Sequence, residues 1–148
     1  MDEMKDRYLF KAKRTDNMEW VQGCCFTKYE RFFIKDIQKS FATTIYNEPS
    51  VVDFNVRAYE VASNTICQCT GLKDKNGKLI WENDIMVAHL DDDYPEDETY
   101  IRIMWHGSGF CSKENGSEDI IPIDKFDREH FEVCGNIFDN PELLESEV

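Results

Sequence analysis

The sequence predicts a mainly β protein of short antiparallel strands that form a barrel or a sandwich. Short runs in which apolar and polar residues alternate recur along the chain, and turn-forming residues separate them. The chain has 148 residues, of which 41% are hydrophobic and 13% aromatic, so it is long and apolar enough to bury a core. Because the sequence contains no internal repeat and no linker, we expect one domain over residues 1–148.

The N-terminal segment predicts a β-hairpin. Residues 7–14 (RYLFKAKR) alternate between apolar and basic side chains, as in a half-buried strand. Asp and Asn favour a turn over residues 15–18, and residues 19–29 return as a second strand. Gly23 within that strand indicates a bulge or a close approach of another backbone. Because Phe10 faces away from the bases of its strand, core packing of the hairpin's aromatic residues is favoured over stacking on nucleic acid.

The next segment is less informative. Residues 31–37 (RFFIKDI) and 41–46 (FATTIY) are rich in β-branched and aromatic residues, which favours strands. A helix over residues 34–41 is the alternative. A loop is expected over residues 47–50, because Pro49 restricts the backbone of the residue before it.

The C-terminal half alternates strands and turns. Asn76-Gly77 is a strong hairpin signal, since both residues tolerate a positive φ. Asp124 is expected to cap one helical turn, and Asn140 with Pro141 to start a short C-terminal helix. Strands are expected over residues 64–72, 80–90, 99–110, 120–123 and 131–138, with a loop over residues 112–119.

An exposed loop is expected over residues 91–98 (DDDYPEDE), where six carboxylates repel one another and Pro95 interrupts the strand pattern. A cation site is disfavoured there, because a rigid site also needs carbonyl ligands in a fixed geometry. Trp81 is expected to pack in the core or to line a groove. With Trp81, the candidate partner-binding residues are Asp91, Asp92, Asp93, Glu96, Asp97 and Glu98.

The formal net charge of −13 is unevenly distributed. Residues 1–40 carry nine Lys or Arg and seven Asp or Glu, a net charge of +2. The remaining residues carry eight against twenty-three, a net charge of −15. A surface this acidic repels phosphates, so direct nucleic-acid binding is not expected. The charge fits a basic protein partner, mimicry of a nucleic acid, or solubility alone.

The chemical motifs are incomplete. Residues 74–77 (DKNG) resemble a calcium loop, but Leu72 and Asn83 then stand where a carboxylate and a bidentate Glu are needed. The nucleophile elbow fails around Ser108, because His106 stands where its first glycine belongs.

The remaining titratable residues are no better placed for chemistry. The three histidines lack metal-ligand spacing, and nothing beside Glu82 and Asp84 is built to give the two carboxyls different pKa values. We therefore expect a protein that is not an enzyme and that holds no metal and no cofactor.

The six cysteines are expected to be buried, reduced thiols. Their spacing, with CC at residues 24–25 and CQC at residues 67–69, is not the CxxC of a structural zinc site, and no secretion signal precedes them. No apolar run approaches the roughly 18 residues that a membrane span needs. A cytoplasmic protein is the expectation.

Four segments carry a family resemblance. They are RYLFKAKRTDNMEWVQG, TICQCTGLKDKNGKLIWENDIM, IRIMWHGSGF and FEVCGNIFDNPELLE, and their most specific marks are the TGL-D-NG-I-E-DI block and the GNIF-NPELL end. In this order they resemble the YopX family of phage and prophage proteins. Residues 30–60 are outside the resemblance, as a variable region. Met18 stands where a turn glycine is usual, and residues 61–64 (VASN) replace a proline-containing approach.

The resemblance implies a mainly β fold with an SH3-like barrel portion, in a mobile-element protein of the bacterial cytoplasm. It implies no activity and no catalytic residues. Our leading hypothesis is a non-enzymatic phage accessory protein that binds a macromolecule, above all a protein. One alternative is an acidic nucleic-acid mimic that inhibits a defence or DNA-processing protein. Another is a homo-oligomeric structural or assembly protein that uses exposed strand edges.

Overall fold

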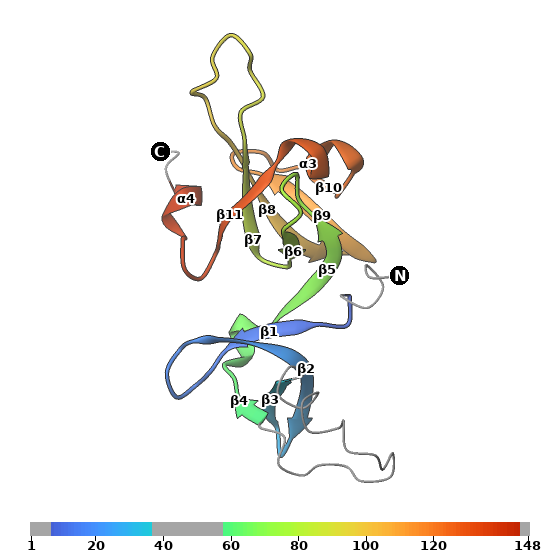
Figure 1. The fold of residues 1–148 in the computed structure, drawn as a ribbon, viewed down its shortest axis with the longest axis vertical. Helices are drawn as coiled ribbons and strands as arrows, with labels where there is room; N and C mark the ends of the chain where they lie inside the picture. Colours follow the sequence, from blue (N-terminus) through green and yellow to red (C-terminus); the bar gives the residue numbers. More distant parts are fainter. Residues whose placement is uncertain (1–6, 37–57, 146–148) are drawn as a thin grey trace. The chain divides into compact units, whose positions relative to one another are not determined.

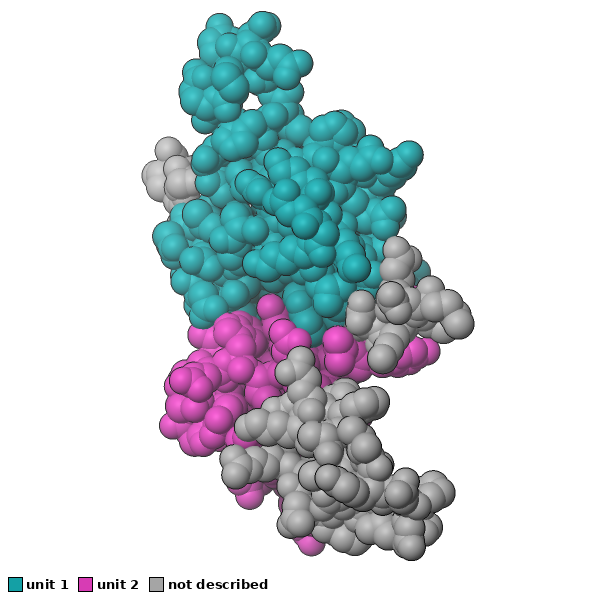
Figure 2. Space-filling model, viewed as in Figure 1, with its two compact units in different colours: residues 1–4, 69–148 teal, residues 5–68 magenta. Residues whose placement is uncertain are grey.

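The computed structural model describes residues 7–36 and 58–145. In this part of the chain the strands form two antiparallel sheets and the helices are short, which confirms the mainly β class. The two sheets are open, so the SH3-like portion that we expected is not a closed barrel. The chain divides into two compact units, unit 2 with residues 5–68 and unit 1 with residues 69–148 and 1–4 (Figure 2).

Unit 2 is an antiparallel sheet of short strands (Figure 1). Its elements are β1 (Phe10–Lys13), β2 (Trp20–Lys28), β3 (Arg31–Asp36), β4 (Ala58–Glu60), the 3-10 turn η1 (Ser63–Thr65) and the start of β5 (Cys67–Lys73). Neighbouring strands follow the order β4-β3-β2-β1-β5. The predicted N-terminal hairpin is confirmed, and the strand β3 is confirmed over the helical alternative at its residues. The predictions for residues 41–46 and 47–50 lie outside the described residues.

One face of this sheet is apolar, because alternate residues of a strand point to the same side. The buried residues are Ala12, Val21, Ile34 and Val61. Phe10 packs against this cluster, as expected. A Cβ atom on Gly23 would lie 1.7 Å from the backbone oxygen of Lys35. The predicted close approach of another backbone at Gly23 is therefore confirmed.

Unit 1 contains a five-stranded sheet with two short helices (Figure 1). Its elements are the end of β5, β6 (Leu79–Trp81), β7 (Asp84–Ala88), β8 (Thr99–His106), β9 (Gly109–Glu114), β10 (Ile120–Pro122), α3 (Lys125–His130), β11 (Glu132–Asn136) and α4 (Glu142–Glu145). The sheet has the order β10-β9-β8-β7-β11, and β6 pairs with β5. The predicted edge strand, the capped helical turn and the C-terminal helix are all confirmed.

The order of the strands in this sheet determines which residues form the core of unit 1. β7 lies between β8 and β11, and all five of its residues are buried. β8 alternates as predicted, with Ile101 and Ile103 buried. The buried cluster consists of Ile80, Met86, Ala88, Ile101, Ile103 and Phe131.

The strand β9 differs from the prediction, which placed a loop over residues 112–119. Gly107, with φ 64°, and Ser108 form a turn, and β9 then pairs with β8 from His106↔Gly109 to Ile101↔Glu114. The segment is polar at its C-terminal end, so its own residues favour a strand only weakly. Pairing with β8 and β10 stabilises it.

Asp74 anchors the predicted hairpin turn between β5 and β6. Its Oδ1 accepts hydrogen bonds from the backbone N–H groups of Asn76 and Lys78, both at 2.9 Å. Its Oδ2 accepts a third from the N–H of Val133 at 2.8 Å. Gly77 takes φ 80°, which glycine adopts without strain. The buried carboxylate of Asp74 therefore holds the turn and ties it to β11.

Helix α3 begins at the predicted cap. Asp124 Oδ1 accepts a hydrogen bond from the N–H of Asp127 at 2.8 Å, and Asp127 Oδ2 accepts one from the N–H of Asp124 at 3.3 Å. This reciprocal pair is a capping box. Asp127 is buried, and its burial raises the pKa of its carboxyl.

We expect the stability of the protein to depend on the charge of Asp127. Because folding raises this pKa, Asp127 stabilises the fold below the unfolded-state pKa of about 3.9 and loses that contribution as pH rises through the folded-state pKa. Asp127→Asn keeps an acceptor oxygen and removes the charge. In urea unfolding at a series of pH values, the variant should gain stability relative to the wild type as pH rises. Asp119→Asn removes an exposed charge as the control, and an equal gain there would contradict the prediction.

Candidate binding surface

The loop between β7 and β8 projects from its sheet in unit 1 (Figure 1). The six carboxylates predicted there are all exposed. Asp91 Oδ1 accepts hydrogen bonds from the N–H groups of Asp93 and Tyr94, at 2.9 and 3.3 Å. The N–H of Asp97 donates to the carbonyl of Tyr94 at 2.9 Å. The loop is therefore made of short turns that its own groups hold.

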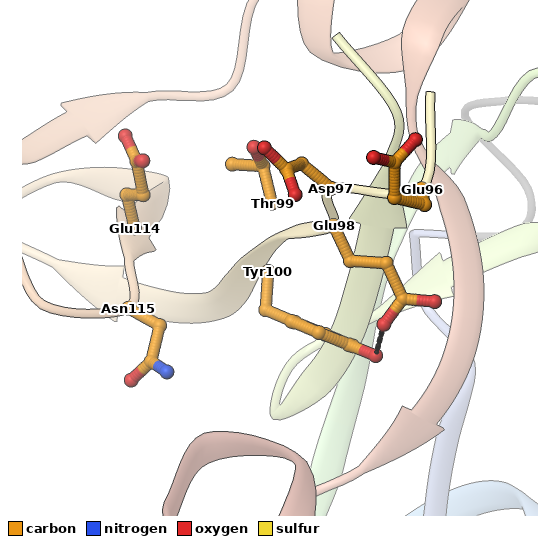
Figure 3. A pocket seen from close by; sticks show the side chains of 7 residues that line it. All are labelled: Glu96, Asp97, Glu98, Thr99, Tyr100, Glu114 and Asn115. Atoms are coloured by element: carbon orange, nitrogen blue, oxygen red, sulfur yellow. Dashed lines mark hydrogen bonds between the residues drawn. The ribbon is translucent and has the colours of Figure 1, made fainter. Parts of the chain in front are cut away.

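An acidic cavity of about 300 Å³ lies where this loop enters β8 (Figure 3). Four carboxylates line it, three from the loop and Glu114 from the end of β9, and none of its lining residues is basic. The structure thus brings Glu114 to the predicted residues 96–98, whereas residues 91–93 do not line the cavity. The full lining is Glu96, Asp97, Glu98, Thr99, Tyr100, Glu114 and Asn115.

Tyr100 is fixed in the wall of the acidic cavity. Its hydroxyl donates a hydrogen bond to Glu98 Oε2, drawn as the dashed line in Figure 3. That bond first, then burial, raises the pKa of Tyr100 to about 12. The phenol therefore stays neutral at physiological pH and holds the Glu98 carboxylate in one orientation.

An apolar pocket of about 310 Å³ adjoins the acidic cavity, since Thr99 and Glu114 line both. Its wall includes three exposed apolar side chains, Leu90, Ile121 and Phe126, the last of them 49% exposed. The acidic lining residues are Glu114, Asp119, Asp124 and Asp127. We call the acidic cavity, with residues 96–98 in its lining, and the adjoining apolar pocket together the acidic surface.

The apolar half of this surface was not predicted from the sequence. Ile121 belongs to the edge strand β10 and Phe126 to α3, and both were predicted only as parts of secondary structure. No local signal marked them, because single apolar residues are common on protein surfaces and only a contiguous patch indicates a contact surface. Only the fold shows that they meet beside Glu114.

Trp81 contributes to the fold more than to this surface. It is 5% exposed, and its backbone N–H donates to Asp84 Oδ2 at 2.8 Å. The expected packing in the core is confirmed. Trp81 therefore offers almost no accessible surface to a partner. Asp84 is also buried, and its carboxylate accepts the hydrogen bond from the Trp81 backbone.

The other residues considered for chemistry lie apart from the two hollows. His106 and Ser108 are exposed at the turn between β8 and β9. In the described residues, no group of three or more His, Cys, Asp or Glu side chains is arranged to hold a metal ion. No helix in the described part of the chain is long and apolar enough to cross a membrane.

The cysteines are free thiols, but the prediction that all of them are buried is wrong. Cys24 and Cys134 are exposed. Cys24 lies on the face of β2 opposite the core, where the alternation of the strand places it. The buried cysteines are Cys67, Cys69 and Cys111.

Comparison with known proteins places the chain in a family. The crystal structure of protein EF1440 from Enterococcus faecalis is similar, with a TM-score of 0.53, 24% sequence identity, and coverage of 91% of this chain and 96% of that chain. This likeness concerns the fold. No curated protein sequence matches the chain. The sequence model of the YopX protein family matches residues 9–145, which include parts of both units. The expectation of a single domain over residues 1–148 stays a prediction. The protein belongs to the YopX family.

Proposed function

We propose that the protein is a non-enzymatic phage or prophage accessory protein that binds a basic protein partner through the acidic surface. The observation that carries this proposal is the shared wall at Thr99 and Glu114, which sets an apolar pocket beside four carboxylates, with no basic residue in the lining of either hollow. The resemblance to phage and prophage proteins supports the accessory role, and the action would take place in the cytoplasm of the bacterial host.

The two hollows fit the two halves of a protein interface. An apolar side chain of a partner that enters the pocket at Phe126 and Ile121 would strengthen the complex, because a few buried anchor residues supply most of the binding free energy. The carboxylates steer a basic partner to the site and select it over acidic ones. A basic segment with one large apolar side chain is therefore the partner chemistry that we propose.

The same proposal holds that the protein is not an enzyme. Carboxylates, hydroxyls, one amide and apolar groups line the two hollows, without a histidine, cysteine or lysine. The Glu98 carboxylate is already engaged by Tyr100. Such a lining supports recognition of a partner. The Ser112 hydroxyl hydrogen-bonds the Asp127 carboxylate in the apolar pocket, but the lining holds no histidine to act as a base toward that hydroxyl.

We expect residues 96–98 to matter more for binding than residues 91–93. E96Q/D97N/E98Q and D91N/D92N/D93N each remove three negative charges, and only the first triple variant changes the acidic cavity. In quantitative capture from a nuclease-treated bacterial lysate, the first variant should lose the partner about tenfold, equivalent to roughly 1.4 kcal/mol. The second should lose clearly less, by long-range charge alone.

The pattern of capture separates the alternatives. Equal losses in both triple variants would indicate a pure charge effect, and no loss in either would exclude the acidic surface. A captured DNA-handling protein that DNA displaces would favour mimicry of a nucleic acid. Recovery of copies of the chain alone would favour self-assembly.

A further inference from the structure

The sheet of unit 2, whose strands β1 to β3 are labelled in Figure 1, has a second face opposite its apolar core. By strand register this face carries bases and aromatic rings. Residues directly opposite each other on paired strands share a face, as do alternate residues along one strand. By this register the rings on the face are Trp20, Phe26 and Phe33. The bases on it are Lys11, Lys13, Lys28, Arg31 and Lys35. We call this the basic aromatic face.

The rings and cations of this face are in contact. The rings of Phe26 and Phe33 stack with centroids 5.4 Å apart, and the Arg31 guanidinium lies 5.6 Å from the Phe33 centroid. At the other end of β2, the ammonium groups of Lys11 and Lys13 lie 4.9 and 5.5 Å from the centroid of Trp20. Flat apolar surfaces therefore lie directly beside positive charges at both ends of β2, and Gln22 and Cys24 occupy the face between them.

The tip of the β2–β3 hairpin continues the pattern. Tyr29 and Glu30 take φ 52° and 61°, a backbone region that non-glycine residues rarely adopt. The turn presents the Tyr29 side chain, which is 86% exposed, with the Lys28 ammonium 5.5 Å from the ring centroid. Positive φ at both positions is what a two-residue hairpin turn between paired strands requires. The tip thus adds a further aromatic ring and leaves it accessible.

The charge of the face is opposite to that of the acidic surface. Five bases lie on it, and Glu60, opposite Phe33, is paired with Arg31. Residues 5–68 carry ten Lys or Arg and eight Asp or Glu, a net charge of +2, although the chain as a whole carries −13. At 0.1 M salt, charges more than about 10 Å apart are largely screened, so the local charges decide what binds.

We propose that the basic aromatic face binds single-stranded nucleic acid. Lysine and arginine side chains would pair with the phosphates while unstacked bases lie on the rings of Trp20, Phe26 and Phe33, the combination used by sequence-tolerant single-strand binders. From Trp20 to Lys28 the strand extends about 26 Å, long enough for several nucleotides. For unit 2 this proposal replaces the expectation that the protein does not bind nucleic acid directly, which was based on the net charge of the whole chain.

Other ligands use only part of what the face offers. An acidic peptide would pair with the bases and leave the rings without a planar partner. Duplex DNA would present phosphates but keep its bases stacked inside the helix. The presence of rings and bases together on one face therefore favours a single strand over both.

The test is fluorescence anisotropy of the full chain with a labelled oligothymidine of about 12 nucleotides, within the range of sites that such faces cover. The logarithm of the binding constant should fall linearly with the logarithm of salt concentration, with a slope of up to about −2.8 for four contacted phosphates, because Arg31 is paired with Glu60. Lys28→Gln and Lys35→Gln should each make this slope shallower by about 0.7.

The aromatic contribution is tested separately. Phe26→Ala should weaken binding about tenfold, the loss expected for one stacked base. Phe32→Ala is the matched control, because Phe32 is also partly exposed on β3 but faces the opposite side of the sheet. Circular dichroism of each variant confirms that it is folded. E96Q/D97N/E98Q should bind the oligonucleotide at least as tightly as the wild type, so this test is independent of the acidic surface.

Several results would overturn the proposal. One is the absence of oligothymidine binding at low salt by the wild type. Another is equal loss of affinity in the Phe26 and Phe32 variants, or no loss in either. Binding of polyglutamate or of a duplex of the same length as tight as that of the single strand would show a plain charge interaction and would also exclude stacking.

Discussion

Gly23→Ala is expected to destabilise unit 2 by roughly 3 kcal/mol, the upper part of the range for overpacking. The added Cβ would lie 1.7 Å from the backbone oxygen of Lys35 and 2.8 Å from its carbonyl carbon. Both atoms belong to the backbone of β3, so relief requires β2 and β3 to separate where Gly23 pairs with Asp36. A flexible side chain could move aside at little cost, but a paired strand cannot.

Hydrogen exchange measured by mass spectrometry locates this effect. Amides of β2 and β3 should lose protection in the Gly23 variant, while those of β7 and β8 keep theirs. Gly109→Ala is the control, because a Cβ there meets no atom within 4 Å and its φ is not in the left-handed region. Native protection of β2 and β3 in the Gly23 variant would show that the backbone approach is looser than the structure has it.

Asp74→Ala is expected to cost unit 1 about 3 kcal/mol, because hydrogen bonds to a charged group contribute more than neutral ones and three are lost. The N–H groups of Asn76, Lys78 and Val133 would lose their acceptor. Asn76 and Lys78 are exposed, so water can replace Asp74 there. The N–H of Val133 in β11 is only partly accessible, and its lost bond should account for much of the effect.

Urea unfolding of three proteins tests this prediction. Asp74→Asn keeps one oxygen for the turn but places an amide nitrogen near one of the former donors, so its stability should fall between those of the wild type and the alanine variant. Lys75→Ala, at an exposed neighbouring position, is the control for changing the turn itself. Equal stability of the alanine variant and the control would contradict the prediction, because it would show that none of the three hydrogen bonds to Asp74 contributes measurably.

Local signals in the sequence were sufficient for much of the fold. Alternation identified β2 and β8, and Asn76-Gly77 marked a turn whose Gly77 indeed has a positive φ. Asp124 was found as a cap for the same reason, since capping depends on residues within one turn of helix. Such features can be predicted because the groups that form them are close in the chain.

Residues whose environment comes from distant strands were predicted wrongly or not at all. β9 was missed because its stability depends on pairing with β8, and the exposure of Cys134 depends on which neighbours cover β11. The acidic loop was predicted correctly as exposed, yet nothing local indicated that Glu114 joins it. Likewise, the facing of Phe10 led to the prediction that all rings of the hairpin are core residues. That prediction did not hold for Trp20, because pairing of β1 with β2 places its ring against Lys11 and Lys13.

By itself, the sequence determined the mainly β class, the order of most strands, the turns, the family and the uneven charge, because periodicity, turn chemistry and composition are properties of short stretches. Tertiary structure alone decided which side chains share a surface. It set an apolar pocket beside Glu114 in unit 1, and it put the bases and rings of β1, β2 and β3 on one face of unit 2. Both surfaces depend on strand pairing, which joins residues far apart in the chain and assigns each side chain to one of two faces.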